Sequence, residues 1–293
     1  AELWPLVEWC LEYCRRQLTA DGVVASDTDE LEGRFPTGDA NLCTSTLYYD
    51  ALLSAVSLGR ELGVESAQTA RYAAQARALA RAIDAHFGGE VGGYDTYRYY
   101  AGNTLLRSWI CMPLIVGLKE RSEGTVRALL GPELMTDDGL LTQQGSSTFW
   151  DRSTLYALRG IYNVGQADRA TELLHRYSQR RLLGDHVPYP IEAWPEGSQR
   201  HLSAESGLYC RIITEGLFGI RPTGLRSFDL TSSMPAAWES MSLRHIRAFG
   251  SDFDITVARV ADGRLRITVA RPGAKPKIYR AAPGATIRVK LTD

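Results

Sequence analysis

The segment Leu105-Leu-Arg-Ser-Trp-Ile-Cys-Met-Pro-Leu-Ile-Val-Gly-Leu118 is apolar on nearly every side of a helix. A surface helix carries one apolar stripe, whereas a helix that is apolar all round is buried by its neighbours. We therefore predict a fully buried helix over residues 105–118. It is shorter than the roughly 20 residues that cross a membrane, and Pro113 interrupts it, so no membrane span is expected.

The predicted helices on either side of this segment are mostly amphipathic. Their apolar residues recur at intervals of three and four, and Gly63 and Gly165 mark helix ends. Helices are predicted over residues 3–14, 47–62, 72–87, 122–130, 149–164, 167–182 and 203–217, which with 105–118 gives about eight. Strongly apolar and amphipathic helices alternate, as they do in antiparallel helical hairpins packed side by side.

The connections between these helices are unequal in length. Long connections rich in Gly, Asp, Thr and aromatic residues span 20–41, 88–102, 131–147 and 184–201, whereas those near 63–66 and 165–166 are short. Loops carry binding and catalytic residues more often than the elements they join. The pattern favours a ring of hairpins with a functional face on the rim that bears the long loops.

The pattern changes to that of β-strands after Pro222. Residues 253–260, 264–270 and 286–291 alternate apolar and polar side chains, and a turn sequence comes directly after each of the first two, Ala261-Asp-Gly263 and Arg271-Pro-Gly273. We predict a helical domain over residues 1–223 and an antiparallel β module over residues 224–293.

The composition is that of a globular protein. The chain has 293 residues and a formal net charge of −1, with 44% hydrophobic and 23% charged residues. Without a basic stripe, neither nucleic acid nor an anionic membrane surface is an expected partner. Cys10 and Cys14 share one predicted helix face, where packing in the core is a simpler interpretation than zinc binding. The histidines lack metal-ligand spacing, and no phosphate loop or nucleotide fingerprint occurs, so no metal and no cofactor are predicted.

Two acidic groups lie on the predicted long loops. In the first, within residues 186–210, Glu192 and Glu196 flank Trp194 in a Pro-rich segment. A carboxylate beside an indole ring is typical of sugar chemistry, because the acid acts on the glycosidic oxygen or on water while the ring covers the apolar sugar face. The members of the second group lie just before the predicted helix at 47–62 and are Asp27, Asp29, Glu30 and Glu32.

Several motifs, in their order along the chain, resemble those of the six-hairpin glycosidases. Residues 38–52, with the Asn-bearing helix start and Tyr-x-Ala-Leu, lead into Gly59-Arg-Glu-Leu-Gly63. Ser147-Thr-Phe-Trp-Asp-Arg-Ser-Thr-Leu155 and Ile191-Glu-Ala-Trp194 with Gly197 come next, and the stretch from Ile220-Arg-Pro222 to Trp238 leads into strands. The chain thus resembles the superfamily of (α/α)6 toroids that includes trehalase, glucoamylase and the α-L-rhamnosidases.

This resemblance implies a mainly α fold, an incomplete (α/α)6 toroid followed by a small antiparallel β-sandwich. Twelve helices complete such a ring, so the resemblance implies that further helices precede Ala1. The compartment is left open, because a chain that begins with Ala gives no information on a signal peptide. The implied activity is hydrolysis of a poly- or oligosaccharide by two carboxylates, with inversion.

The resemblance also implies roles for the two acidic groups. It places the general acid among Asp27, Asp29, Glu30 and Glu32, and the general base at Glu192 or, in its place, Glu196. Trp194, Trp150 and Tyr189 are expected to hold the sugar, and Arg200 and Asp151 are further candidates for binding it.

Plainer interpretations stay open for the same residues. The acidic loop 27–32 could be a solvated turn or a cap for the helix that begins near Asn41. Asp151 could cap its own helix, Glu196 could cap the next helix or pair with Arg200, and Glu205 lies where a helix dipole favours a carboxylate. A sugar-binding or scaffold protein on the same fold, or a glycoside phosphorylase, are the alternative functions.

Overall fold

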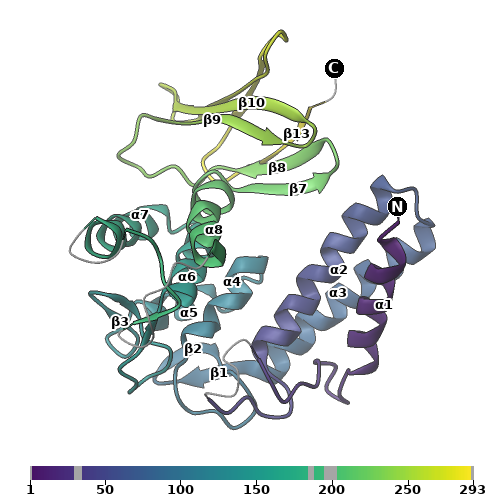
Figure 1. The fold of residues 1–293 in the computed structure, drawn as a ribbon, viewed down its shortest axis with the longest axis vertical. Helices are drawn as coiled ribbons and strands as arrows, with labels where there is room; N and C mark the ends of the chain where they lie inside the picture. Colours follow the sequence, from purple (N-terminus) through teal and green to yellow (C-terminus); the bar gives the residue numbers. More distant parts are fainter. Residues whose placement is uncertain (1, 30–34, 184–187, 195–202, 292–293) are drawn as a thin grey trace.

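The structure, a computed structural model, describes residues 2–29, 35–183, 188–194 and 203–291 (Figure 1). Its described part contains eight α-helices and three shorter 3₁₀ or π segments. The α-helices are α1 (Trp4–Arg16), α2 (Leu42–Glu61), α3 (Ser66–Phe87), α4 (Met112–Val116), α5 (Ser122–Leu129), α6 (Asp151–Asn163), α7 (Ala167–Tyr177) and α8 (Ser203–Arg211). The shorter segments are η1 (Ser108–Cys111), η2 (Ser178–Leu182) and η3 (Ile212–Leu217).

The apolar segment 105–118 is buried as predicted, but it is not one continuous helix. Every residue from Leu106 to Val116 is buried. The chain makes the 3₁₀ turn η1 and only then the short helix α4, with Pro113 in its first turn. Proline lacks an N–H and is tolerated only at a helix start, so the regular helix has to begin just before it.

Helix α1 contributes less to the core than its pattern predicts. Leu11 is buried and Cys14 is partly buried, whereas Leu3 is 72% exposed and Cys10 is exposed. The prediction that Cys10 packs in the core is therefore wrong. The face of α1 that meets α2 runs through Trp4 and Leu11, and Gly59 of α2 lets the Trp4 ring approach closely.

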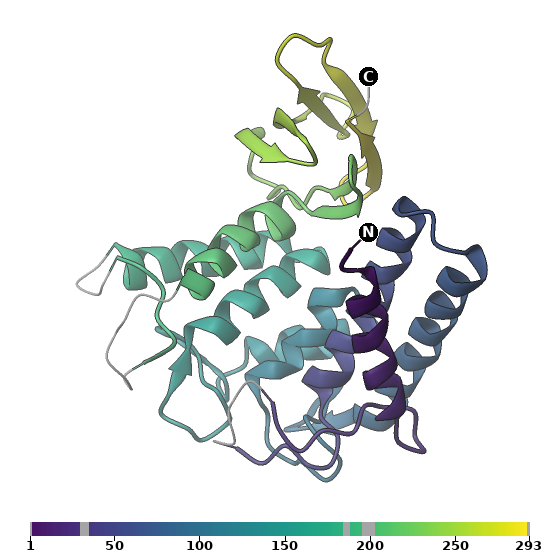
Figure 2. The same cartoon turned by 45° about the vertical axis from the view of Figure 1, so that its right-hand side comes forward.

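Short hairpins occupy the long connections at one end of the helices. Strands β1 (Gly88–Val91) and β2 (Tyr94–Tyr97) pair antiparallel, as do β3 (Met135–Thr136) and β4 (Gly139–Leu140). Strand β5 (Phe149–Trp150) pairs with β6 (Ala193–Trp194), which is far away in sequence. Figure 1 shows the first two hairpins at the lower end of the helices, and Figure 2 shows the C-terminal strands above the opposite end.

The C-terminal part consists of two antiparallel sheets. Sheet order is β12-β11-β10-β9 in one and β13-β8-β7 in the other. Their strands are β7 (Ile220–Gly224), β8 (Ser227–Thr231), β9 (Ser240–Ala248), β10 (Ser251–Arg259), β11 (Leu265–Ala270), β12 (Lys277–Ala281) and β13 (Thr286–Lys290).

The two sheets meet through buried aromatic side chains. Phe228 of β8 stacks on Phe253 of β10 with ring centroids 5.6 Å apart. The three predicted strands correspond to β10, β11 and β13, whereas β9 and β12 were not predicted. The predicted boundary between the two domains, after residue 223, falls within strand β7, which begins at Ile220 and ends at Gly224.

Among the described residues, no helix combines the length and the apolar character that a membrane crossing requires.

Close backbone approach makes Gly124 of α5 a sensitive position. A Cβ there would lie 1.9 Å from the carbonyl oxygen of Asp95 in β2. We expect Gly124→Ala to lower the free energy of unfolding by about 1–3 kcal/mol, because α5 and β2 must separate to admit the methyl group. The control is Gly207→Ala in α8, where no atom lies within 4 Å and alanine should add up to about 1 kcal/mol. Urea denaturation measures both, and equal effects would contradict the packing argument.

Candidate active site

Glu192 lies on the segment that carries strand β6, and strand pairing fixes its place. Trp150 of β5 pairs with Ala193, and the backbone N–H of Asp151 donates a hydrogen bond to the carbonyl oxygen of Glu192 (3.3 Å). The Glu192 side chain is 41% exposed. The backbone is thus held at the start of α6, while the carboxylate remains accessible to solvent.

Arg152 connects Glu192 to a buried carboxylate. Its Nη2 lies 3.5 Å from Glu192 Oε1, and its Nε donates to Glu205 Oε1 at 2.7 Å. The side chain of Glu205 is fully buried in the first turn of α8. The guanidinium also lies over the Trp150 ring, 5.4 Å from its centroid. Glu205 and the Trp150 ring therefore hold Arg152 in place, and its Nη2 faces the Glu192 carboxylate.

The two tryptophans beside this cluster are buried. Trp150 is 2% exposed, and its ring meets the Trp109 ring edge to face, with centroids 6.5 Å apart. Trp150 was predicted from the sequence to contact sugar. In the structure it contacts Arg152 and Trp109, so its described contacts are those of a residue that supports the site.

Asp151 takes part in a buried ion pair. Its carboxylate lies 3.1 Å from Nη1 of Arg181, and both side chains are 2% exposed. Asp151 Oδ2 also accepts the backbone N–H of Ile191 at 2.7 Å. Arg181 in turn donates to the carbonyl oxygen of Asp138 at 2.7 Å. Asp151 thus ties the start of α6 to η2 and to the Glu192 segment, and it does not cap its own helix.

The acidic loop is anchored to the start of α2. Asn41 is fully buried, caps α2 through Oδ1 (2.8 Å to the Thr44 N–H) and donates through Nδ2 to the carbonyl oxygen of Thr28 (3.0 Å). The helix cap is therefore Asn41 and not a carboxylate of the loop. Because one side chain serves both contacts, the loop and the helix start have fixed positions relative to each other.

Asp29 is the better held of the two described carboxylates in this loop. The Tyr99 hydroxyl donates to Asp29 Oδ2 at 2.5 Å, whereas Asp27 is exposed. Burial raises the pKa of Tyr99 far above its ordinary value, with a smaller contribution from the hydrogen bond to Asp29, so the hydroxyl stays protonated.

An arginine that was not among the predicted site residues, Arg107, lies near Asp29. Arg107 is 1% exposed, and its guanidinium lies 4.9 Å from the ring centroid of Tyr99, with the rings of Phe35 and Tyr100 also within 6 Å. Burial lowers its pKa. The one signal in the sequence was a charged residue inside the apolar segment 105–118.

Several predicted site residues cannot be placed in the site. Glu30, Glu32, Glu196 and Arg200 lie outside the described residues, and for Trp194 the structure describes the backbone alone. Tyr189 is described and partly buried, three residues before Glu192. Within the described part of the chain, no three His, Cys, Asp or Glu side chains gather in a way that could hold a metal ion.

The described members of both acidic groups lie at the same end of the helices. Asn41 precedes α2, Arg107 precedes η1, Trp150 precedes α6 and Glu205 lies in the first turn of α8. Figure 1 shows the start of α2 and the β1–β2 hairpin together at the lower end of the helices. A chain of contacts runs between the two groups. On the Asp29 side, the Tyr99 hydroxyl binds Asp29, and the Arg107 guanidinium lies over the Tyr99 ring. On the Glu192 side, Trp109, two residues after Arg107, packs against Trp150.

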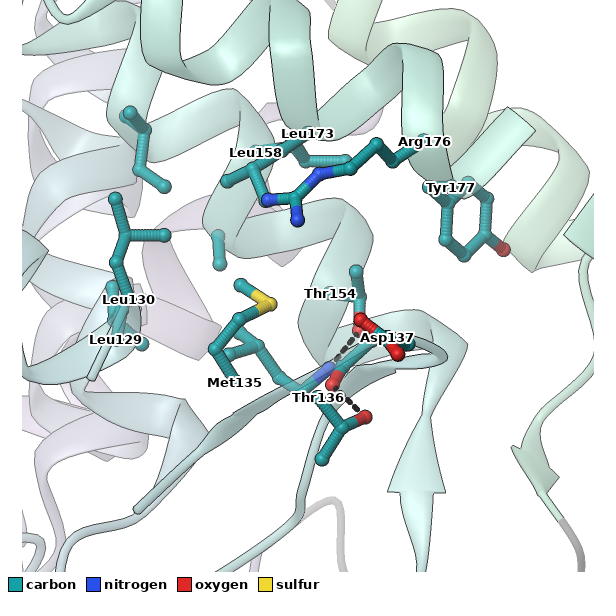
Figure 3. Close-up of a pocket in the computed structure, with 14 residues that line it drawn as sticks. Leu129, Leu130, Met135, Thr136, Asp137, Thr154, Leu158, Leu173, Arg176 and Tyr177 are labelled. Atoms are coloured by element: carbon teal, nitrogen blue, oxygen red, sulfur yellow. Dashed lines mark hydrogen bonds between the residues drawn. The ribbon is translucent and has the colours of Figure 1, made fainter. Parts of the chain in front are cut away.

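An apolar cavity beside α6 is too small for a sugar. It lies between α5, α6, α7 and the β3–β4 hairpin, with a volume of about 30 Å³. Figure 3 shows the Arg176 guanidinium extending across it between Leu158 and Met135. That volume admits one or two waters at most, so the cavity is a packing gap.

The chain was compared with family models, with curated protein sequences and with solved structures. No family model matches the sequence, and no curated protein sequence matches it either. The solved structure of a GH78 family rhamnosidase of Bacillus sp. GL1 matches 95% of this chain with a TM-score of 0.58 and 14% identity. The chain therefore shares the fold of the corresponding part of that rhamnosidase.

Two further solved structures give lower TM-scores of 0.49. One is the α-L-rhamnosidase of Streptomyces avermitilis (13% identity, 98% of this chain, 30% of that chain). The other is neutral trehalase of Saccharomyces cerevisiae (16% identity, 64% of this chain, 40% of that chain). The chain spans 29% of the length of the Bacillus rhamnosidase.

The contribution of the buried Asp151–Arg181 ion pair to stability can be tested by substitution. We expect Asp151→Ala to lower the free energy of unfolding by about 3–5 kcal/mol, because it leaves Arg181 buried and uncompensated. The control is Asp229→Ala, which breaks a more exposed pair with Arg288 and should cost at most about 1 kcal/mol. Chemical denaturation measures both values, and a cost below about 1 kcal/mol for Asp151→Ala would contradict the assignment.

Proposed function

We propose that this chain carries the site of a glycoside hydrolase that uses two carboxylates, on a helical toroid followed by a β-sandwich. Glu192 is the general base, and the general acid comes from the loop 27–32. The observation that supports the proposal best is the Glu192 carboxylate, accessible to solvent yet aligned by Arg152, which buried Glu205 holds in place. A base that activates water needs this combination of access and fixed orientation.

Asp29 is our candidate for the acid among the described carboxylates. The Tyr99 hydroxyl donates to its Oδ2, and this contact orients the carboxyl group that would protonate a leaving oxygen. An inverting mechanism requires roughly 6.5–9.5 Å between acid and base so that water fits between them. Glu30, Glu32 and Glu196 remain candidates from the sequence.

The substrate is proposed to be a poly- or oligosaccharide. Trp194 and Tyr189 flank Glu192 in sequence and are the proposed contacts to the sugar, with Arg200 on the same loop. We assign Trp150 and Asp151 to supporting roles, because Trp150 contacts Arg152 and Asp151 binds the Ile191 N–H.

Glu192→Gln tests the base. We expect turnover of oligosaccharides to fall by roughly 10²–10⁴-fold while binding persists, since the amide keeps the shape but accepts no proton. Initial rates over a panel of aryl glycosides and oligosaccharides give the activity, and calorimetry gives the affinity. Glu172→Gln, an exposed change on α7, is the matched control. Full activity in Glu192→Gln would refute the assignment.

The same panel separates the alternative functions. Binding of sugars by the unaltered chain without any turnover would favour a binding or scaffold protein. A rate that requires inorganic phosphate would favour a phosphorylase.

Asp29→Asn tests the acid by the choice of leaving group. We expect a large loss of turnover with oligosaccharides and a much smaller loss with dinitrophenyl glycosides, because an activated phenolate departs without a proton. Asp262→Asn, an exposed change on the turn between β10 and β11, is the control and should leave both rates close to those of the unaltered chain. Equal losses on both substrates would show that Asp29 does not protonate the leaving oxygen.

A further inference from the structure

A polar cleft separates the helical part from the C-terminal sheets, at the end of α6 opposite to the candidate active site. Its walls come from α2, α4, α6, η3 and the strands β7, β8 and β13, and its volume is about 420 Å³. That volume lies within the roughly 300–1,000 Å³ of small-molecule sites. Trp150 precedes α6 and Asn163 ends it, so the 13 residues of the helix separate the two places by about 20 Å.

The cleft carries an excess of positive charge. Four cationic side chains line it, but only two carboxylates do, Asp50 and Glu215. The cations are Lys119, Arg159, Arg211 and Arg221. Such a wall attracts anions, and the low-dielectric surroundings of a cleft strengthen the attraction.

A single carboxylate serves two of these guanidiniums. Glu215 Oε2 accepts from Arg159 at 2.8 Å and from Arg211 at 2.9 Å, and its Oε1 accepts from Arg211 at 2.5 Å. Arg159 is only 7% exposed, and its pKa is lowered by burial, with Arg211 acting in the same direction. One carboxylate cannot neutralise two guanidiniums, so a partly buried positive charge is left over.

Two polar side chains of the lining, Asn163 and Ser233, can accept hydrogen bonds from the hydroxyl groups of a ligand. Asn163 donates through Nδ2 to the carbonyl oxygen of Ile115 (3.0 Å), and Ser233 donates to that of Tyr162 (3.1 Å). An amide and a hydroxyl used as donors in this way present oxygen lone pairs as acceptors. Among the described residues that line the cleft none is aromatic, so a ligand there is held by charge and hydrogen bonds and not by stacking.

We propose that this cleft is a binding site for a small anionic sugar, a hydroxylated ring that bears a carboxylate or a phosphate. The anionic group meets Arg211, Lys119 and the exposed edge of Arg159, and the hydroxyls donate to Asn163 and Ser233. Because the walls belong to both the helices and the sheets, the bound sugar bridges the two. The site is separate from the proposed catalytic one and does not depend on it.

Calorimetry on the full chain tests the proposal with four probes, glucuronate, glucose 6-phosphate, glucose and inorganic phosphate. We expect both acidic sugars to bind, with affinity falling as ionic strength rises, and the stronger of the two to show which anionic group is preferred. Glucose and inorganic phosphate should bind at least about tenfold more weakly. If phosphate alone binds as well as either acidic sugar, or no probe binds, the proposal is wrong.

Exposed variants locate the site without disturbing the fold. Arg211→Gln and Lys119→Gln should each weaken binding by about tenfold. Asp50→Asn should strengthen it, because Asp50 now pairs with Arg221 (3.1 Å) and its neutralisation leaves that guanidinium for the anion. Arg264→Gln is the matched control, because it also removes one positive charge but lies at an exposed position just before β11, outside the cleft lining. It should leave the affinity unchanged.

Two further readouts keep this result distinct from the catalytic proposal. Glu192→Gln should bind the acidic sugar as the unaltered chain does, whatever its turnover. Thermal unfolding of each variant without ligand checks that the fold is intact. Unchanged affinity in Arg211→Gln and Lys119→Gln would place the ligand elsewhere and overturn the inference.

Discussion

The ion pair between Asp151 and Arg181 is the constraint on which the site end of the molecule depends. Neither charge can reach water, so each requires the other, and together they fix three segments at one point. The start of α6, η2 and the chain before Glu192 are all held there. The same carboxylate accepts the Ile191 N–H, one residue from Glu192. Asp151, which was expected to bind sugar, thus fixes the backbone next to Glu192.

Buried charge recurs around the same end of the helices. Arg107 is enclosed by aromatic rings beside Asp29, and Arg152 lies between buried Glu205 and accessible Glu192. Unpaired charge inside a protein is costly, so each such group restricts where its neighbours can lie. The arrangement holds Glu192 and Asp29 in defined places, as the proposed acid–base chemistry requires.

Helix α6 relates the two sites of the molecule to each other. Its first residues belong to the Glu192 cluster, and its last turns supply Arg159 and Asn163 to the cleft beneath the sheets. Ser233 donates to the carbonyl oxygen of Tyr162, also near the end of α6, so the sheets are attached where the helix ends. A ligand in the cleft would therefore contact the same helix whose first residues lie beside Glu192.

The sequence by itself determined the helices, the strands with clear alternation and the candidate residues, because periodicity and loop composition are local properties of the chain. It named Glu192 and the loop 27–32 as candidates, and the resemblance to six-hairpin glycosidases agrees with the fold of the structure that the chain matches. The tertiary structure alone decided that segment 105–118 divides at Pro113, that Cys10 faces outward and that Trp150 and Asp151 are buried. It also revealed Arg107 and the shared Glu215. Burial and pairing of charge depend on residues far apart in sequence, and no local pattern records them.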